Sequence, residues 1–402
     1  MHLYYDSRKY SVQLSAPPSS ETFYRITDIA RSESELLRHL ETFIDMMRSE
    51  EPYAIGFPGN LDFEFSRLSG LLDIFVNNVG DPSGIEKSAV SSKAMECAVV
   101  EFIARLANAD STEVYGYITA GGSEANLFGL DRGCEALPQA SIYCSTAAHY
   151  SIAKNARLMR RQLVAVDTDA SGRIAPDALE RACRRAEGRG AVVVATIGTT
   201  MSGAVDDVDA IVTAAAAAGP VYVHADAALS GLIVPFTEIA ETWGFARPEV
   251  GSIAISMHKG LGMPVPCALA ICRNDLVHQH IHGEYIGAAD ATLGCSRSGL
   301  AAILIWYALA AKGAAGLAEN AHRALATARY ASSRLAELGL SPKLQPYSIV
   351  VVFDRPAESI CRKYHLATEG TVAHLVTVSH VTPAIIDELC KDIQRSADNV
   401  ER

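Results

Sequence analysis

The sequence lacks the long apolar runs of a membrane protein. No run approaches the ~20 apolar residues that a membrane span requires. The first residues, MHLYYDSRKY, contain no apolar core of the kind found in signal peptides. The composition is also unlike that of a disordered chain, because 49% of the residues are hydrophobic and 20% are charged. We therefore expect a folded, cytoplasmic protein without a membrane segment.

Positively charged residues are fewer than negatively charged residues. The chain has 35 lysines and arginines against 46 aspartates and glutamates, which gives a net charge of -11. Because nucleic acids are bound by clustered cations that contact phosphates, this balance argues against a nucleic-acid partner. A small molecule is the partner that we expect.

The cysteines and the one histidine cluster favour neither disulfides nor a metal site. The nine cysteines contain no C-x-x-C pair, and an odd number cannot close completely into intrachain disulfides, so we expect reduced thiols. His278, His280 and His282 alternate in HQHIH, but the sequence offers no second cluster of metal ligands. We interpret these histidines as a solvated strand or loop edge and expect no bound metal.

From about residue 113, short β-rich runs alternate with helical patterns. The run VYGYIT precedes SEANLFGLDRGCEAL, for example, and AVVVATIG precedes VDAIVTAAAAAG. This alternation predicts an α/β fold with a mostly parallel sheet and helices on both faces, in which ligands bind at the carboxyl ends of strands. We expect an N-terminal arm and helix over 1–60, a large domain over 61–305 and a small C-terminal α/β domain over 306–402.

The stretch TAGGSEANLFG places two glycines between a strand and a helix. Gly121 and Gly122 permit a tight turn, and Ser123 lies at the helix start, where backbone amides and a hydroxyl suit a phosphate. The stretch is not a Walker loop, since no G-K-[ST] follows, nor a dinucleotide-binding G-x-G-x-x-G. Taken alone, an N-capped helix after a glycine turn explains it equally well.

The stretch VYVHADAALSG ends a hydrophobic strand with Asp226. A carboxylate there stays ionised only with a cationic partner or several hydrogen-bond donors, and a protonated ring nitrogen would be such a partner. The small Ala228 would let a planar ring lie close to the strand. An aspartate that caps a helix is the alternative.

Lys259 in SMHKGLGMP follows the apolar run GSIAIS, 33 residues after Asp226. In a partly desolvated pocket a lysine has a lowered pKa and becomes a nucleophile for aldehydes, whereas a solvated loop lysine is the alternative. A phosphate site, an acidic partner for a pyridinium and an imine-forming lysine are the parts that a pyridoxal phosphate site requires. Their order and their placement at strand ends predict this cofactor.

Two further stretches extend the predicted site. His149 in AAHYSIAK lies at a strand-to-helix turn, where its imidazole can stack on the cofactor ring opposite Ala228, although a structural histidine is the alternative. Thr199 and Thr200 in IGTTMSGAVDD end another strand. A hydroxyl there could reach the ring oxygen of the cofactor or the carboxylate of the substrate.

Several long motifs resemble the group II pyridoxal phosphate-dependent amino acid decarboxylases, nearest the bacterial histidine decarboxylases and plant serine decarboxylases. They are GYITAGGSEANLFG, HYSIAK, IGTTMSGAVDDVDAI, HADAALSGLIVPF, SMHKGLGMPVPCALA and TLGCSRSG, and the similarity runs from about residue 53 to the end. The resemblance implies fold type I, the aspartate aminotransferase-like fold, with a mostly parallel seven-stranded sheet. It also implies decarboxylation of an L-amino acid to the amine and CO2.

The resemblance implies a role for each matching residue. Lys259 would form an imine with the cofactor aldehyde, Asp226 would pair with the pyridine nitrogen, and His149 would stack on the ring. The phosphate would be held by Gly122, Ser123, Ser256 and His258.

Further implied roles concern the rim of the site. Thr200 would lie near the ring oxygen, and Tyr285 is a candidate proton donor to Cα, with His149 as its rival. Ser296 and Arg297 resemble a loop that reaches a neighbouring subunit's site. The resemblance therefore implies a homodimer whose active site lies at the subunit interface.

One departure from the family leaves the substrate open. Close relatives carry an asparagine-tyrosine pair that faces the substrate after NNVGDP, whereas this chain reads SGIEKSAVSSK, with Lys87 and Ser88 near those positions. Histidine, serine and small aliphatic amino acids are not ranked. Another pyridoxal phosphate reaction on the same scaffold, such as decarboxylation coupled to oxidative deamination to an aldehyde, or carbon-sulfur chemistry, is the alternative. A non-catalytic binding subunit is the third hypothesis.

Overall fold

The computed structural model describes residues 26, 28–84, 90–278, 281–283 and 288–400. The chain divides into two compact units, Met1–Glu51 and Pro52–Arg402. In the first unit, helix α2 (Glu33–Glu50) begins after Ser32, whose hydroxyl accepts a hydrogen bond from the Glu35 amide at 3.3 Å. None of the residues of α2 is buried. The domain boundaries after residues 60 and 305 stay predictions.

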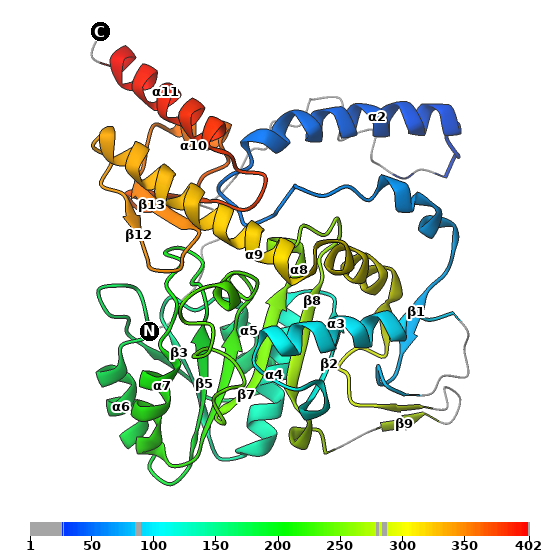
Figure 1. Cartoon of the computed structure of the whole chain (residues 1–402), viewed down its shortest axis with the longest axis vertical. Helices are drawn as coiled ribbons and strands as arrows, with labels where there is room; N and C mark the ends of the chain where they lie inside the picture. Colours follow the sequence, from blue (N-terminus) through cyan, green and yellow to red (C-terminus); the bar gives the residue numbers. More distant parts are fainter. Residues whose placement is uncertain (1–25, 27, 85–89, 279–280, 284–287, 401–402) are drawn as a thin grey trace. The chain divides into compact units, whose positions relative to one another are not determined.

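The larger unit contains a seven-stranded sheet in which one strand runs against the others (Figure 1). The order is β2-β8-β7-β6-β5-β3-β4, and β8 is antiparallel to both of its neighbours. The prediction of a mostly parallel seven-stranded sheet is therefore confirmed. The strands are β2 (Val114–Thr119), β3 (Ser141–Ser145), β4 (Leu163–Val166), β5 (Ala191–Thr196), β6 (Val221–Asp226), β7 (Val250–Ser256) and β8 (Ala268–Arg273).

Helices cover both faces of this sheet. Successive residues of β5 alternate between them: Val193 and Ala195 pack in the cluster that includes α3, α6 and α7, whereas Val192 and Val194 pack with α4 and α5. Continuous runs of Val and Ala suit a strand that is buried on both sides. The covering helices are α3 (Lys93–Leu106), α4 (Gly122–Ala136), α5 (Ser151–Leu158), α6 (Pro176–Arg184) and α7 (Val208–Ala215).

A smaller antiparallel sheet follows in the C-terminal part of the chain. Its strand order is β12-β13-β15-β14, and its core contains Phe353, Leu375 and Leu389. The predicted small α/β region is thus present. Its elements are β12 (Lys343–Leu344), β13 (Val350–Asp354), α10 (Glu358–Lys363), β14 (Ala367–Glu369), β15 (Val372–Val376) and α11 (Pro383–Val400).

The long helix α9 (Gly299–Glu337) joins the two cores. By length and composition alone it could cross a membrane. Leu304 near its start packs in the core of the seven-stranded sheet, and Leu335 near its end packs in the core of the smaller sheet. Between them, Gly313 has a non-helical backbone conformation. The apolar residues of α9 therefore serve two protein cores, which identifies it as a core helix.

Short elements complete the structure. Strand β1 (Asn77–Val79) pairs with β11 (Ser296–Ser298), and β9 (Ile281–Gly283) pairs with β10 (Ala288–Asp290), both antiparallel. Within the described residues, the remaining helices are α8 (Met257–Gly260) and the 3-10 helices Glu51–Tyr53, Ser66–Asp73, Ser111–Glu113, Ala216–Ala218, Val234–Phe236 and Asn274–Leu276.

Candidate active site

Asp226 and Lys259 come from two adjacent parallel strands. Asp226 is the last residue of β6, and Lys259 lies in α8 directly after β7. The two strands pair through Asp226 and Ala254. Because the carboxyl ends of parallel strands meet at one edge of a sheet, this register brings both residues to the same edge.

The electrostatics of the site link Lys259, Asp226 and His149. Burial lowers the pKa of the Lys259 amine, and the negative charge of Asp226 opposes that shift. Burial also lowers the pKa of His149, which the charge of Asp226 opposes and the charge of Lys259 reinforces. The three groups therefore form one interacting cluster. An amine with a lowered pKa is uncharged more often near neutral pH, which makes it a better nucleophile.

His149 lies just before α5 and is oriented by Ser151. The Ser151 amide donates to Nδ1 at 3.2 Å, and the Ser151 hydroxyl lies 2.7 Å from the same nitrogen. Because a backbone amide can only donate, Nδ1 is the acceptor in the neutral ring and the proton is on Nε2. His149 thus has a free N–H to offer through Nε2.

The carboxylate of Asp226 is held by two donors. The Asn126 side-chain amide donates to Oδ2 at 2.9 Å, and the Ala228 amide donates to Oδ1 at 3.2 Å. Sequence reasoning predicted Asp226 and Ala228 but missed Asn126. The signal was its position: Asn126 lies one turn into the helix that follows the glycine pair.

Gly122, at the start of α4, approaches the end of β7 closely. A Cβ at Gly122 would lie 2.7 Å from the Ser256 hydroxyl, so a larger residue would not fit without displacement. Among the described residues, no side chain caps this helix at Gly121, which leaves its first amides available to an anion. With Ser123, these residues outline the predicted phosphate cradle.

His258, also predicted at the phosphate, is oriented by Cys267. Its Nδ1 lies 2.9 Å from the Cys267 carbonyl oxygen, and the Cys267 amide donates to the same nitrogen at 3.3 Å, so Nδ1 faces the Cys267 backbone. Burial lowers the pKa of His258, which favours the neutral ring. The ring nitrogen that faces a ligand would then be Nε2.

The two predicted threonines have different surroundings. Thr199 is buried, and its hydroxyl accepts a hydrogen bond from the Ala204 amide at 3.0 Å and lies 2.7 Å from the Ser202 hydroxyl. Thr200 is exposed in the turn that follows. The Thr199 hydroxyl is therefore already hydrogen-bonded within its own loop. Thr200 is the threonine whose hydroxyl could reach a ligand.

Thr196 is a site residue that sequence reasoning missed. It is buried and pairs in register with Asp226, so both side chains point to the same face of the sheet. Within the described part of the chain, its hydroxyl has no hydrogen-bond partner. A buried hydroxyl of this kind is satisfied by a polar group of a ligand or by water.

Arg297 is committed to its own chain. Its guanidinium forms a buried ion pair with Glu96 at 2.8 Å and donates to the Gly80 carbonyl at 2.8 Å. With 4% of its side chain exposed, Arg297 is buried within its own chain, and its predicted role at the cofactor stays a prediction. The exposed Ser296 accepts a hydrogen bond from Asn77 at 3.2 Å, and its predicted role stays a prediction. Tyr285, Lys87 and Ser88 lie outside the described residues.

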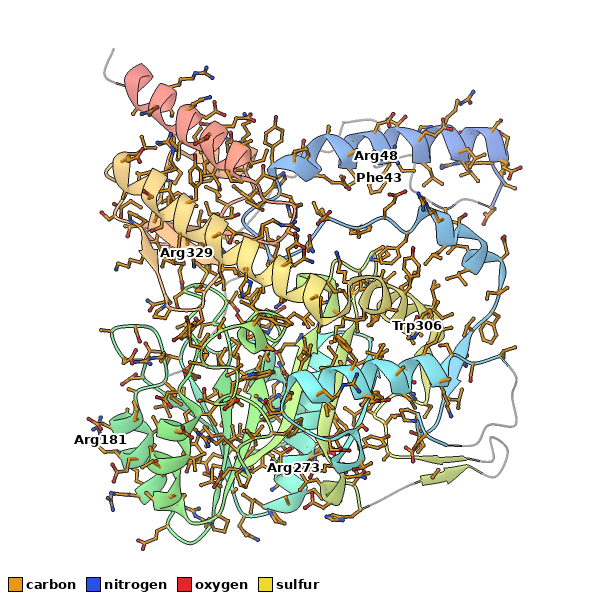
Figure 2. The ribbon with its side chains drawn as sticks, viewed as in Figure 1. Phe43, Arg48, Arg181, Arg273, Trp306 and Arg329 are labelled. Atoms are coloured by element: carbon orange, nitrogen blue, oxygen red, sulfur yellow. The ribbon has the colours of Figure 1, made fainter. Side chains whose placement is uncertain are left out.

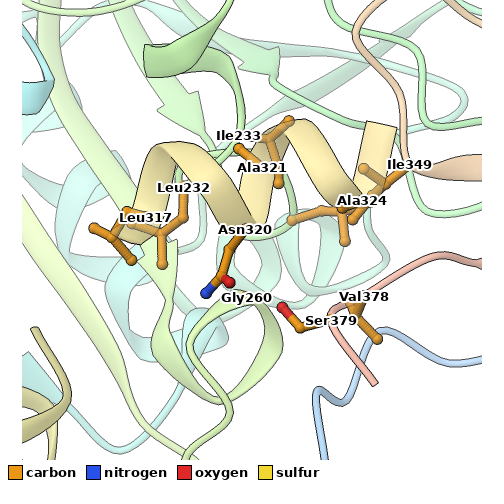
Figure 3. A pocket seen from close by; sticks show the side chains of 11 residues that line it. Leu232, Ile233, Gly260, Leu317, Asn320, Ala321, Ala324, Ile349, Val378 and Ser379 are labelled. Atoms are coloured by element: carbon orange, nitrogen blue, oxygen red, sulfur yellow. The ribbon is translucent and has the colours of Figure 1, made fainter. Parts of the chain in front are cut away.

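A small cavity lies behind Gly260, between α8 and α9 (Figure 3). Its volume of ≈ 20 Å³ is room for about one water molecule. An amino acid side chain does not fit in this cavity. The cavity is lined by Leu229, Leu232, Ile233, Gly260, Leu317, Asn320, Ala321, Ala324, Ile349, Val378 and Ser379.

The residues at this edge of the sheet fit pyridoxal phosphate. The glycine-lined start of α4 suits a phosphate, the Asp226 carboxylate suits a protonated ring nitrogen, and the half-buried Lys259 amine with its lowered pKa suits an aldehyde. A nucleophilic lysine and a carboxylate on adjacent parallel strands, beside an uncapped helix start, define a pyridoxal phosphate-dependent enzyme of fold type I.

Comparison with known proteins narrows the class. The pyridoxal-dependent decarboxylase conserved domain matches residues 133–344. The chain is 35% identical to serine decarboxylase 2 of Oryza sativa subsp. japonica, over 92% of this chain and 79% of that protein. It is 37% identical to the histidine decarboxylase of Solanum lycopersicum, over 90% of this chain and 89% of that protein. The chain belongs to the pyridoxal-dependent decarboxylase family.

The fold agrees with solved structures. L-methionine decarboxylase from Streptomyces sp. 590 superimposes with a TM-score of 0.87, over 94% of this chain and 98% of that chain, at 21% sequence identity. That identity supports the fold alone. Together with the family match, it confirms a fold type I carboxy-lyase that uses pyridoxal phosphate to decarboxylate an amino acid.

Proposed function

We propose that Lys259, Asp226 and His149 form the catalytic centre, which converts an L-amino acid to its amine and CO2. The observation that carries this proposal is that Asp226, at the end of β6, and Lys259, directly after β7, meet at one edge of the sheet, where burial lowers the pKa of the amine. Pyridoxal phosphate, when bound, supplies the electron sink for the pair left behind when the carboxylate departs. The protein has to hold that group, keep its ring nitrogen protonated and orient the substrate.

The assigned roles follow from the chemistry of each side chain. Lys259 would hold the cofactor through its amine, which is nucleophilic because burial favours its neutral form. Asp226 would keep the ring nitrogen protonated through its negative charge. The remaining ligands would be Gly121, Gly122, Ser123, Ser256 and His258 at the phosphate, Thr200 at the ring oxygen, and Ala228 and His149 at the two ring faces.

Among the residues that the structure describes, His149 is the candidate for the donor of the proton to Cα. His149 offers an N–H on Nε2, because Nδ1 accepts from the Ser151 amide. Tyr285 stays the rival prediction. His149→Gln keeps an N–H near the Nε2 position but cannot give up that proton, because an amide is not a general acid near neutral pH. Loss of amine release by this variant with cofactor binding retained would support His149 as donor, and unchanged amine release would favour Tyr285.

The amino acid substrate is tested by product analysis. The purified protein loaded with pyridoxal phosphate is incubated with a mixture that contains serine, histidine, methionine and small aliphatic amino acids. Mass spectrometry identifies the products, and an amine that matches one substrate is expected. An aldehyde with hydrogen peroxide would favour the alternative of oxidative deamination, and the absence of any product would contradict both.

We propose further that the protein is a homodimer. The exposed fractions of Leu72, Ile74 and Phe75 are 76%, 54% and 73%, and Trp306 on α9 is also exposed (Figure 2). Exposed apolar groups of this kind mark protein-protein contacts. Light scattering should give twice the chain mass, and Phe75→Glu should reduce it. Leu158→Glu, at an exposed leucine on α5, is the matched control.

We propose a cytoplasmic location. Each of the nine cysteines lies in the described part of the chain and is a free thiol. Free thiols suit a reducing compartment. Fractionation of cells that express the tagged chain should recover it with soluble cytoplasmic markers, and recovery from the secreted or membrane fraction would contradict this proposal.

A further inference from the structure

A row of buried polar side chains ends on Asp226. Asn126 donates to Asp226 at 2.9 Å, His224 Nε2 lies 3.0 Å from Asn126 Oδ1, and His224 Nδ1 lies 2.8 Å from the Ser252 hydroxyl. Tyr222 continues the row, with its hydroxyl 2.7 Å from that of Ser252. All five residues are buried. Buried polar groups outside a catalytic centre are costly unless they are paired, so a complete row is a built feature.

Glycines make room for this row beneath α4. A Cβ at Gly129 would lie 2.2 Å from His224 Nδ1, and one at Gly133 would lie 2.7 Å from the Tyr222 ring. On the other side, a Cβ at Gly251 of β7 would lie 2.2 Å from the same ring. The helix and the strand can therefore approach one another only because these positions lack side chains. The polar row and its glycines form one packing unit.

The hydrogens along the row have one consistent direction. Burial lowers the pKa of His224 to about 4, so the ring is neutral near pH 7 and carries one proton. The Asp226 carboxylate only accepts, which turns the NH2 group of Asn126 toward it and leaves Oδ1 facing His224. The proton of His224 is then on Nε2, and the Ser252 hydroxyl donates to Nδ1.

The same amide also approaches the other side of the site. Asn126 Nδ2 lies 3.4 Å from the Ser151 hydroxyl, and Ser151 orients His149. Asn126 thus connects the group assigned to the ring nitrogen with the group assigned to the ring face. A change in its orientation would alter both.

We infer that Asn126 and His224 are positioning residues, which hold the Asp226 carboxylate oriented toward the ring nitrogen of the cofactor. This inference rests on the proposed role of Asp226. A neutral donor on Oδ2 favours the ion pair between the carboxylate and a pyridinium over the neutral pair of carboxylic acid and pyridine. Without that donor, the ion pair loses a stabilising hydrogen bond and the shared proton moves away from the ring.

The test measures the protonation of the ring nitrogen directly. Asn126→Leu removes the donor at similar volume, and 15N NMR of the protein loaded with 15N-labelled pyridoxal phosphate reports the ring nitrogen. We expect a shift toward the unprotonated position. The dissociation constant of the cofactor, followed by fluorescence quenching, should rise by roughly 10- to 100-fold, the size of one hydrogen bond to a charged group.

A matched pair of variants separates positioning from packing. His224→Gln keeps an N–H near the Nε2 position and can still donate to Asn126, whereas His224→Asn loses that donor. We expect His224→Gln to resemble the wild type and His224→Asn to resemble Asn126→Leu in the 15N spectrum. Tyr222→Phe removes a hydroxyl from the far end of the row and should leave the ring nitrogen protonated.

The outcomes distinguish this inference from the proposed function. If the wild type gains no visible absorbance with pyridoxal phosphate, the proposed function is wrong. If the wild type binds the cofactor but Asn126→Leu keeps the wild-type 15N shift and dissociation constant, only the positioning role is wrong. Equal effects of the two His224 variants would also overturn it, and thermal unfolding of each apoprotein verifies that every variant is folded.

Discussion

Asp226 and Lys259 influence each other across two adjacent parallel strands. The charge of Asp226 raises the pKa of the Lys259 amine, whereas burial lowers it, and burial has the larger effect. The charge of Asp226 therefore limits how far burial lowers the pKa of the Lys259 amine. This balance suits a lysine that must release the cofactor aldehyde to the substrate amine and take it back after the reaction.

Replacement of the lysine tests the covalent link to the cofactor. Lys259→Ala should abolish the visible absorbance of the bound cofactor and reduce amine production to background, because no other amine is assigned to the cofactor aldehyde. The exposed Lys343→Ala is the control and should leave both unchanged. Undiminished visible absorbance in Lys259→Ala would refute the assignment.

Removal of the charge at Asp226 should affect both chemistry and the lysine. Asp226→Asn should reduce kcat by about 10²- to 10³-fold, as expected when a preorganised charge is lost from an active site. It should also lower the pKa of Lys259 further, since the charge of Asp226 raises it. The pH dependence of amine modification in the apoprotein measures this change, and a midpoint that moves to higher pH would contradict the arrangement.

The buried His224 should make stability depend on pH. Its pKa is about 4 in the folded state, below the usual 6.5, so the unfolded state binds more protons between these values. The free energy of unfolding therefore falls as the pH decreases from 6.5 to 4, by up to about 3 kcal/mol. Urea denaturation of the apoprotein at several pH values measures this slope.

His224→Gln provides the comparison, because it should remove this contribution. Burial raises the pKa of Asp206 to about 6, so Asp206 changes the free energy of unfolding with the opposite sign in an overlapping pH range. Because the wild type and the His224→Gln variant both contain Asp206, its contribution cancels in the comparison. The difference in slope thus isolates His224. Identical slopes for the two proteins would mean that His224 is not held neutral by burial.

The buried ion pair of Glu96 and Arg297 should contribute strongly to stability. Glu96→Gln leaves the buried guanidinium without its charge partner and should lower the free energy of unfolding by about 3–5 kcal/mol. Glu101→Gln, on the same helix α3, removes an exposed partner of Arg105 and should cost less than about 1 kcal/mol. If urea denaturation gave the same loss of unfolding free energy for both variants, the buried ion pair would contribute no more to stability than the exposed one.

The strand-end residues of the site could be predicted from local pattern. Each β-rich run ends at a polar residue or a glycine, and in a mostly parallel sheet such ends meet at one edge, so Gly122, Asp226 and Lys259 were predicted together. Apolar runs and turn residues are local properties of the chain. The sequence alone was therefore enough to predict this part of the site and the α/β fold.

Other parts of the site depend on contacts between distant residues. Asn126 is 100 residues from Asp226 in the sequence, and Glu96 is 201 residues from Arg297. Neither pairing leaves a local pattern, because an asparagine inside a helix or an arginine after a loop is commonly solvated. The burial of Arg297 against Glu96 was not predicted for this reason.

By itself, the sequence determined the alternation of strands and helices and the chemical groups at the strand ends, because periodicity and turn chemistry act over a few residues. Only the tertiary structure decided which neutral groups hold Asp226, where Arg297 is buried and that α9 is a core helix. Those features arise from packing between elements, where burial forces each polar group to find a partner.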